Sequence, residues 1–565
     1  MISDIETGVR TTPRAPVSLT RAVLLLALWL LVAANWPLWL AVARAGGAPS
    51  LYAPQLPGLA LVVACGSAAL LALGAFARVA HLWWLLVILV AAGVQHYMLA
   101  YHVVIDPTMV ANVMQTNVTE VRDLLGWRLL RDLLLVAGPP AVWLWRVELQ
   151  ALPWPRQLGR NALLVLAAVG VMVAGVFASY RQLAPLMRNE PQLRYMINPL
   201  APAYSLLRQG SRSGARSAQA LATISAGTTA GPSYAAGQPP PLFVLVVGET
   251  ARADHFGLNG YARDTTPELA RASVLSWRQA QSCGTSTAAS VPCMFSHLGR
   301  EAFEARRGES ENLLDVLQAA GLAVLWVDNQ AGCKGVCDRV PHASTADRQD
   351  TPRGRALCEG GECLDDMLLE GLDERIAQLP AERRARGTVV VLHQMGSHGP
   401  AYYRRSDAAR KRLGTECRDI ALDRCAPGEL VNAFDHSIAY TDHFLAGVID
   451  WLRARQSDHQ VAMLYMSDHG ESLGEYGLYL HGMPYAFAPA QQKHVPLVFW
   501  AGTLASRTGV DAGCLAGQLD APASHDNLYP TLLGLLDVAS PTYRPALDLF
   551  GPCRAGGGQL LARRS

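Results

Sequence analysis

The chain has 565 residues and a formal net charge of +2, so it carries no global basic field of the kind that attracts nucleic acid. A chain of this length is too long for a single domain. Its mean hydropathy of +0.16 is high for a soluble enzyme, and most of the apolar excess lies before Tyr180. The composition therefore predicts a membrane-associated N-terminal third followed by a more polar domain.

Five segments of the N-terminal third are expected to span a membrane, which takes about 20 apolar residues. Four are strongly apolar: residues 22–43, 56–77, 79–101 and 162–180. The fifth, residues 129–145, is weaker, because Arg131 and Asp132 lie near its start and Gly138-Pro139-Pro140 is expected to interrupt it. The proposed cytoplasmic segments carry seven arginines and the opposite loops carry four, which favours a cytoplasmic N-terminus and a C-terminal domain on the other side.

The eleven cysteines divide the chain in the same way. Only Cys65 lies in the apolar third. Ten cysteines follow residue 280, mostly as close pairs: Cys283/Cys293, Cys333/Cys337, Cys358/Cys363 and Cys417/Cys425, with Cys514 and Cys553 left over. An even number of cysteines in close pairs favours disulfides formed in an oxidising compartment. Zinc-binding cysteine clusters are the alternative, but no pair has a second pair at the spacing of a zinc ribbon.

We expect three parts along the chain: a transmembrane domain at residues 1–183, a connection at 184–240 and a second domain at 241–565. Residues 188–208 mix apolar side chains with arginines, as in an amphipathic helix lying on a membrane. Residues 211–240 are rich in Ser, Ala, Gly and Thr, which is typical of a flexible bridge.

A polar stripe lies between the third and fourth expected spans. Asn112, Thr116 and Glu120 stand four residues apart, so they would share one face of a helix. At the membrane surface this stripe would suit a lipid headgroup, with Glu120 facing a cation. An ordinary solvated helix face is the alternative.

Three short apolar runs in the C-terminal domain end beside candidate ligands. The runs and their following residues are Leu242–Val247 with Glu249, Thr388–Leu392 with His398, and Val461–Met466 with Asp468 and His469. Continuous apolar runs are typical of buried parallel strands covered by helices. Because functional groups gather beyond the C-terminal ends of such strands, we predict an α/β domain with a mostly parallel central sheet and a site at that edge.

The polar segment Gln281–Ser296 supplies candidate nucleophiles between Cys283 and Cys293. Thr285, Ser286 and Thr287 precede a predicted helix, whose unpaired N–H groups can hold a phosphate. A serine- and threonine-rich surface loop is the alternative interpretation.

The residue types at the strand ends favour metal-assisted chemistry. Two carboxylates and an imidazole suit Zn²⁺, although Mn²⁺ and Mg²⁺ accept such ligands too. A threonine hydroxyl at the metal would be an activated nucleophile, giving a covalent intermediate. His398 and His481 are candidates for a second metal or for protonating the leaving group, and Lys334 and Asn329 are candidates for binding the substrate phosphate.

Five motifs resemble those of the phosphoethanolamine transferases of Gram-negative bacteria, which include the lipid A enzymes behind polymyxin resistance. They are GETARADH at Gly248–His255, SCGTSTAASVPCMFS at Ser282–Ser296, HQMGSHGPAYYRR at His393–Arg405, SDHGESLGEYGLYLHG at Ser467–Gly482 and KHVPLVFW at Lys493–Trp500. The expected spans, NVMQTNVTE at 112–120 and RYMINPLAPAYSLLR at Arg194–Arg208 extend the resemblance over the whole chain.

This resemblance implies a multi-pass protein of the inner membrane with an alkaline phosphatase/sulfatase-like domain in the periplasm. It selects Thr287 over Thr285 as the nucleophile. The implied zinc ligands are Glu249, Thr287, Asp468 and His469, with His398 and His481 at a second zinc or the substrate phosphate. It also assigns Asn112, Thr116 and Glu120 to the lipid headgroup.

The implied reaction moves phosphoethanolamine from phosphatidylethanolamine to lipid A, in a protein expected to be a monomer. The lipopolysaccharide core as acceptor and phosphoglycerol as the donated group are alternatives with the same chemistry. A membrane-anchored sulfatase or phosphatase is a further alternative, but the C/S-x-P-x-R motif of sulfatases is absent from the expected strand–helix turn. A periplasmic metal-binding scaffold is the non-enzymatic alternative.

Overall fold

A computed structural model describes residues 16–45, 56–115, 121–122, 124–217, 220–234 and 237–554. The chain divides into two compact units, which we call the helical unit and the sheet unit. The helical unit comprises Met1–Leu99 and Gly126–Ser205, and the sheet unit comprises Ala100–Leu125 and Leu206–Ser565. Residues 100–125, which separate two expected spans, therefore group with the sheet unit.

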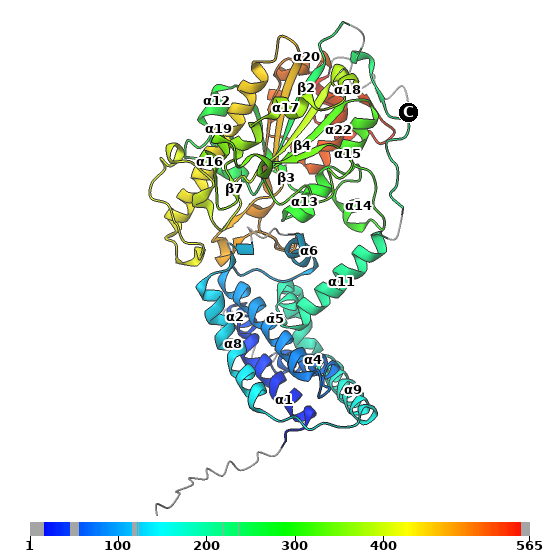
Figure 1. The fold of residues 1–565 in the computed structure, drawn as a ribbon, viewed down its shortest axis with the longest axis vertical. Helices are drawn as coiled ribbons and strands as arrows, with labels where there is room; N and C mark the ends of the chain where they lie inside the picture. Colours follow the sequence, from blue (N-terminus) through cyan, green and yellow to red (C-terminus); the bar gives the residue numbers. More distant parts are fainter. Residues whose placement is uncertain are drawn as a thin grey trace, which may run out of the picture. The chain divides into compact units, whose positions relative to one another are not determined.

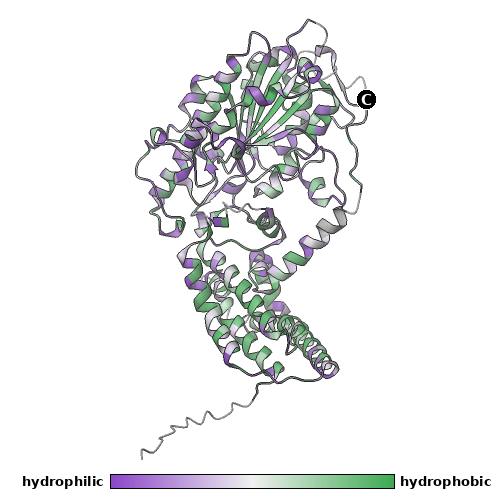
Figure 2. Cartoon of the chain, in the orientation of Figure 1, coloured by the Kyte–Doolittle hydropathy of each residue, from purple (hydrophilic) through white to green (hydrophobic). Residues whose placement is uncertain are grey.

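The helical unit consists of apolar helices, which are mostly green in Figure 2. They are α1 (Leu19–Trp29), the π-helix η1 (Leu30–Ala34), α2 (Trp36–Ala45), α4 (Leu56–Leu73), α5 (Ala80–Ala100), α8 (Trp127–Arg146), α9 (Trp154–Ala178) and α10 (Tyr180–Asn189). Helix α11 (Leu200–Ser217) begins in this unit and continues into the sheet unit.

Three described helices, α4, α5 and α9, are long and apolar enough to cross a membrane. Helices α1 and α2 meet at a bend of 48° and would together form a fourth span. The expected fifth span is not confirmed, because α8 carries Arg128, Arg131 and Asp132 near its start. The expected interruption of α8 is wrong: the helix continues through Pro139 and Pro140, and its neighbouring apolar side chains pack in the core of the unit.

Two buried asparagines, Asn35 and Asn198, form hydrogen bonds where the helix is interrupted between η1 and α2. Asn35 donates through Nδ2 to the carbonyl oxygens of Leu30 at 2.9 Å and of Asn198 at 2.6 Å. The main-chain N–H of Asn198 donates to Oδ1 of Asn35 at 2.9 Å. Asn198 also donates through Nδ2 to Ala91 O at 2.7 Å. These amides therefore satisfy main-chain groups where the helix is interrupted.

The sheet unit is built on eight strands in the order β13–β3–β12–β9–β2–β8–β4–β5. The strands are β2 (Pro241–Gly248), β3 (Leu275–Gln281), β4 (Ala323–Asp328), β5 (His342–Ser344), β8 (Thr388–His393), β9 (Gln460–Ser467), β12 (His494–Trp500) and β13 (Ala523–Ser524). The three expected apolar runs form adjacent central strands, with β2 parallel to both β8 and β9. The sheet is mixed because β12 is antiparallel to both of its neighbours.

Helices cover both faces of this sheet (Figure 1). Phe243, Leu245 and Val247 of β2 belong to one apolar core, together with residues of α13 (Thr287–Met294), α15 (Leu313–Ala319) and α22 (Leu528–Leu535). The alternate β2 residues Leu242 and Val244 belong to the second core, with residues of α12 (Pro267–Arg271) and α19 (Pro427–Arg453). Because alternate residues of a strand point to opposite faces, β2 contributes to both cores, and the unit has three layers: helices, sheet and helices.

Short elements complete the sheet unit. They are α6 (Pro107–Gln115), α14 (Arg300–Ala305), α16 (Pro352–Leu357), α17 (Leu372–Ala377), α18 (Ala381–Arg386), α20 (Leu504–Arg507) and α21 (Ala512–Ala516), and the strand pairs β1 (Thr229–Ala230) with β14 (Val538–Ala539), β6 (Cys358–Glu359) with β7 (Glu362–Cys363), and β10 (Ser472–Leu473) with β11 (Tyr479–Leu480). Because β1 pairs with β14 and Tyr234 donates to Leu536 O at 2.7 Å, this part of the expected flexible bridge is held to the sheet unit.

The sheet unit contains five disulfides, and the four close cysteine pairs are each bonded as expected. Cys283 bonds to Cys293, Cys333 to Cys337, Cys358 to Cys363, Cys417 to Cys425, and Cys514 to Cys553. The last bond pairs the two cysteines that spacing alone left over. Cys65, in α4, is a free thiol.

The disulfide between Cys417 and Cys425 closes the loop that leads into α19. Cys417 is buried, whereas Cys425 is only half-buried and packs against the second apolar core. Cys425 lies two residues before Pro427, the first residue of α19. The disulfide therefore ties this loop to the start of α19.

Candidate metal centre and nucleophile

Glu249, Asp468 and His469 meet at the C-terminal ends of β2 and β9. The two strands are adjacent and in register at Gly248 and Ser467, so the residues that follow them emerge side by side. All three side chains are completely buried. One ligand atom from each lies within 4.8 Å of the others, a spacing that allows all three to reach a single metal ion.

Thr287 is the first residue of α13 and points at this cluster. Its Oγ1 donates a hydrogen bond to Oε2 of Glu249 at 3.0 Å and lies 3.5 Å from Nε2 of His469. Thr285, the other candidate threonine, donates instead to the carbonyl oxygen of Met483 at 2.6 Å. The turn before α13 therefore places the hydroxyl of Thr287, and not that of Thr285, against the acidic cluster.

Main-chain groups orient the candidate ligands. Nδ1–H of His469 donates to Gly470 O at 2.9 Å, which leaves Nε2 facing the two carboxylates. The N–H groups of Thr250 and His469 donate to Oδ1 of Asp468 at 3.1 and 2.7 Å. Oδ2 of Asp468 is buried without a hydrogen-bond partner among the described residues. Asp468 thus keeps one oxygen available for a cation.

The buried charges also favour a cation. Burial, followed by the nearby Glu249 carboxylate, raises the pKa of Asp468. Burial opposes protonation of His469, but Asp468 and Glu249 together raise its pKa to about 10. When the imidazole acts as a neutral ligand, two negative charges remain in a fully buried site, which a divalent ion would balance. The oxygen and nitrogen donors fit Zn²⁺.

Two further histidines lie beside this cluster. The rings of His481 and His469 have centroids 4.3 Å apart, and those of His481 and His398 are 5.5 Å apart. Burial lowers the pKa of His398 and of His481 to about 3, so both rings are neutral. Nδ1 of His481 lies 3.3 Å from Oε1 of Glu471, whose other oxygen accepts a hydrogen bond from Tyr402 at 3.0 Å. Neutral imidazoles at this place can donate to a phosphate or bind a metal.

Asn329 and Lys334 are held in other hydrogen bonds. Asn329 donates through Nδ2 to Asp365 at 2.8 Å and accepts from the hydroxyl of Thr345 at 2.6 Å. Nζ of Lys334 donates to the carbonyl oxygen of Gln115 at 3.1 Å. The structure does not bring either side chain into hydrogen-bond contact with the three ligand residues, as far as the described residues go.

The expected headgroup stripe is described only in part. Asn112 is half-buried in α6, whereas Thr116 and Glu120 lie outside the described residues. Helix α6 packs against α13, the helix that begins with Thr287. Asn112 therefore belongs to a helix of the sheet unit that touches the nucleophile helix.

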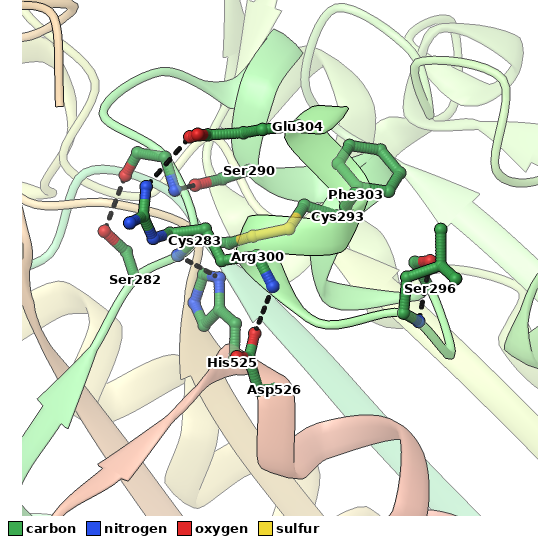
Figure 3. Close-up of a disulfide and its surroundings, with 12 residues drawn as sticks. Ser282, Cys283, Ser290, Cys293, Ser296, Arg300, Phe303, Glu304, His525 and Asp526 are labelled. Carbon is green, nitrogen blue, oxygen red and sulfur yellow. Dashed lines mark hydrogen bonds and ion pairs between the residues drawn. A yellow bond between two sulfur atoms is a disulfide. The ribbon is translucent and has the colours of Figure 1, made fainter. Parts of the chain in front are cut away.

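Two residues of the site were not anticipated. Nε2 of Gln330 donates to Oε2 of Glu249 at 3.0 Å. Gln330 follows β4, whose apolar run ending in Asp-Asn-Gln carries the same signal as the three recognised strands. His525 lies against the Cys283–Cys293 disulfide (Figure 3) and contacts the segment before Asp468. It follows a two-residue strand, so neither a motif nor an apolar run points to it.

Comparison with known proteins identifies relatives of both units. A family model described as phosphoethanolamine transferase EptA/EptB matches residues 63–213, and a sulfatase model matches residues 241–538. Phosphoethanolamine transferase EptA of Salmonella typhimurium is 38% identical over 476 residues, covering 83% of this chain and 84% of the relative. Phosphatidylethanolamine transferase Mcr-1 of Escherichia coli is 37% identical over 465 residues, covering 81% and 83%.

A solved structure resembles the whole chain. Lipooligosaccharide phosphoethanolamine transferase A from Neisseria meningitidis, an integral membrane protein, has a TM-score of 0.86 at 31% identity. The match covers 94% of this chain and 98% of that structure.

Proposed function

Because the chain belongs to the phosphoethanolamine transferase family, we propose that it transfers phosphoethanolamine from phosphatidylethanolamine to lipid A. In this proposal Thr287 carries the phosphoethanolamine group covalently between the two half-reactions. The observation that carries the proposal is the hydrogen bond between Thr287 and Glu249, beside two further buried metal-ligand candidates. A relative named phosphatidylethanolamine transferase supports the donor. A relative named Kdo(2)-lipid A phosphoethanolamine 7''-transferase, 28% identical over 489 residues, supports the acceptor class.

In the first half-reaction Thr287 Oγ1 attacks the phosphorus of phosphatidylethanolamine. The new O–P bond forms as the bond to the diacylglycerol oxygen breaks, and diacylglycerol leaves with the proton that the Thr287 hydroxyl loses. Zn²⁺ held by Glu249, Asp468 and His469 would supply a Lewis acid beside the hydroxyl. Glu249 orients the Thr287 hydroxyl by accepting a hydrogen bond from it, and Gln330 donates a hydrogen bond that holds Glu249 in place.

The neutral histidines are assigned to the phosphate. His398 and His481 lie beside the ligand cluster and can each donate one N–H to a phosphoryl oxygen, or bind a second metal. In the second half-reaction an acceptor hydroxyl oxygen attacks the phosphorus of phospho-Thr287, the bond between Oγ1 and phosphorus breaks, and the proton lost by the acceptor restores the Thr287 hydroxyl. Adding an ammonium group lowers the negative charge of lipid A, which would weaken attraction for cationic peptides such as polymyxin.

The proposed location is the inner membrane, with the sheet unit in the periplasm. Five disulfides in the sheet unit support an oxidising compartment. Helix α8 is proposed as a fifth span beside the candidate spans, and the protein as a monomer. Asn112, Thr116 and Glu120 are proposed to bind a lipid headgroup, supported by the contact of α6 with α13. A lipopolysaccharide core sugar as acceptor, and phosphoglycerol as the donated group, are the alternatives.

The nucleophile is tested by trapping the intermediate. Full-length protein in detergent is mixed with phosphatidylethanolamine and quenched in acid, and the intact mass is recorded. We expect the wild type and Thr285→Ala to gain the mass of one phosphoethanolamine group, and Thr287→Ala to gain none. A mass gain on Thr287→Ala would overturn the assignment. Mass spectrometry of lipid A from cells with wild-type or Thr287→Ala protein tests the acceptor.

A further inference from the structure

A buried imidazole joins the segment of the nucleophile to the strand of the metal ligands. His525 begins the 3-10 helix η13 (His525–Asn527) and is 1% exposed. The main-chain N–H of Cys283 donates to its Nδ1 at 3.0 Å, and its Nε2–H donates to the carbonyl oxygen of Ser467 at 2.9 Å. Figure 3 shows the first bond beside the Cys283–Cys293 disulfide.

The two partners determine the protonation state of the ring. A main-chain N–H can only donate, so Nδ1 of His525 carries no proton; a carbonyl oxygen can only accept, so Nε2 carries one. Burial lowers the pKa of His525 to about 4, which agrees with a neutral ring. Both nitrogens are therefore used in one defined tautomer.

Each hydrogen bond ends close to a proposed catalytic group. Ser467 directly precedes Asp468, and its hydroxyl donates to the carbonyl oxygen of His469 at 3.0 Å. On the other side of the ring, Cys283 is bonded to Cys293, which lies in the helix that begins with Thr287. The imidazole thus connects the end of β9 to both ends of the nucleophile segment.

We propose that His525 is a positioning residue that sets the distance between Thr287 Oγ1 and the metal ligands. This role rests on the proposed function, because it takes Thr287 as the nucleophile. A displacement of about 1 Å in a reacting group can lower a rate by about 10²-fold. A ring hydrogen-bonded to two main-chain groups resists such a displacement without touching the substrate.

The test compares two substitutions at this position with a matched control. His525→Phe keeps the ring volume and removes both hydrogen bonds, whereas His525→Asn retains an amide oxygen near Nδ1 for the Cys283 N–H. His436→Phe is the control, because His436 is also fully buried and accepts a main-chain N–H, from Leu413 at 3.0 Å, but in a segment that carries no proposed site residue.

Single-turnover formation of phospho-Thr287 from phosphatidylethanolamine separates positioning from folding. We expect His525→Phe to lower the rate constant by about 10²-fold, with unchanged zinc content and an unchanged donor concentration at half-saturation. His525→Asn should recover part of this loss. The control should lower only the amplitude, which counts folded molecules, and keep the wild-type rate constant.

A wild-type rate constant in His525→Phe, with only the amplitude reduced, would overturn the proposal. If that variant yields no folded protein, the rate constant of His525→Asn decides in the same way: a lowered value supports positioning and a wild-type value contradicts it. Absence of phospho-Thr287 in the wild type would instead refute the nucleophile assignment, so the two failures are distinguishable.

Discussion

The helical unit and the sheet unit both bury polar side chains, but they balance them in different ways. In the helical unit Asn35 and Asn198 are neutral amides that bond to each other and to helix carbonyls. In the sheet unit Glu249 and Asp468 are two buried carboxylates in a ligand cluster whose one imidazole is that of His469. A neutral amide pair is largely satisfied by the protein, whereas a buried acid pair requires a cation. The candidate site therefore differs from the helical unit because its buried charges are not balanced by protein groups, and not simply because it buries polar side chains.

Removing the metal from the sheet unit should have the largest effect on both activity and stability. With a chelator we expect transfer activity to fall to background and the free energy of unfolding to drop by about 4 kcal/mol, the linkage expected for zinc at about 1,000 times its Kd. Both should return when Zn²⁺ is added, as measured by thermal unfolding and diacylglycerol release. Asp468→Asn should show little response to the chelator. Unchanged unfolding of the wild type after verified metal removal would contradict a buried acid pair that needs a cation.

The sheet unit also contains a buried ion pair in which a protein cation, and not a metal, faces the carboxylate. Arg405 bonds to both oxygens of Glu362 at 2.8 and 3.2 Å and donates through Nε to His398 O at 2.9 Å. Glu362→Gln should lower the free energy of unfolding by about 3 kcal/mol, because it removes the carboxylate charge that faces the buried guanidinium. Glu362→Gln combined with Arg405→Met should recover much of this loss in denaturant titrations. Additive losses would show that the pair is not coupled.

The neutral histidine at position 525 gives a pH-dependent case. Its folded pKa of about 4 lies below the ordinary value of 6.5, so the unfolded chain binds the proton first as the pH falls. Its contribution is therefore fully present above pH 6.5 and is lost as the pH falls towards 4, by up to about 3 kcal/mol. Denaturation midpoints of the wild type and His525→Asn between pH 7 and pH 4.5 should converge at the acidic end. Parallel curves would exclude this linkage.

The smallest effect is expected in the helical unit. Asn35→Leu removes a neutral amide and leaves the N–H of Asn198 without its acceptor. Hydrogen bonds between membrane helices contribute about 1 kcal/mol each, so we expect a modest loss of thermal stability in detergent. Turnover per folded molecule should stay at the wild-type value. A loss of turnover as large as that caused by metal removal would show that the helical unit takes part in the chemistry.

The arrangement of the site was predictable because parallel strands bring their following residues to one edge. Glu249 and Asp468 are more than two hundred residues apart, yet the apolar runs before them form neighbouring strands in register. The choice between Thr285 and Thr287 was not predictable from residue types, since both are hydroxyls in one turn. The structure distinguishes their directions, because Thr285 bonds to the Met483 carbonyl.

Long-range partners explain what the sequence could not indicate. Lys334 lies between two bonded cysteines, and its ammonium donates to the carbonyl oxygen of Gln115, 219 positions away in the chain, a partner that the local sequence does not indicate. Gly138-Pro139-Pro140 suggested an interruption of this segment, whereas packing of Val136 and Leu144 in the unit's core accompanies a continuous helix. Such outcomes depend on neighbours that local patterns do not contain.

The inclusion of residues 100–125 in the sheet unit affects how the protein can be dissected. The polypeptide passes between the two units three times, after Leu99, Leu125 and Ser205. A secreted fragment starting at residue 206 would keep the threonine, acids and histidines, but it would lack α6 and uncover the side of α13 that α6 contacts. Donor cleavage by this fragment, compared with that by the intact chain, would therefore measure what the segment containing α6 contributes to the site.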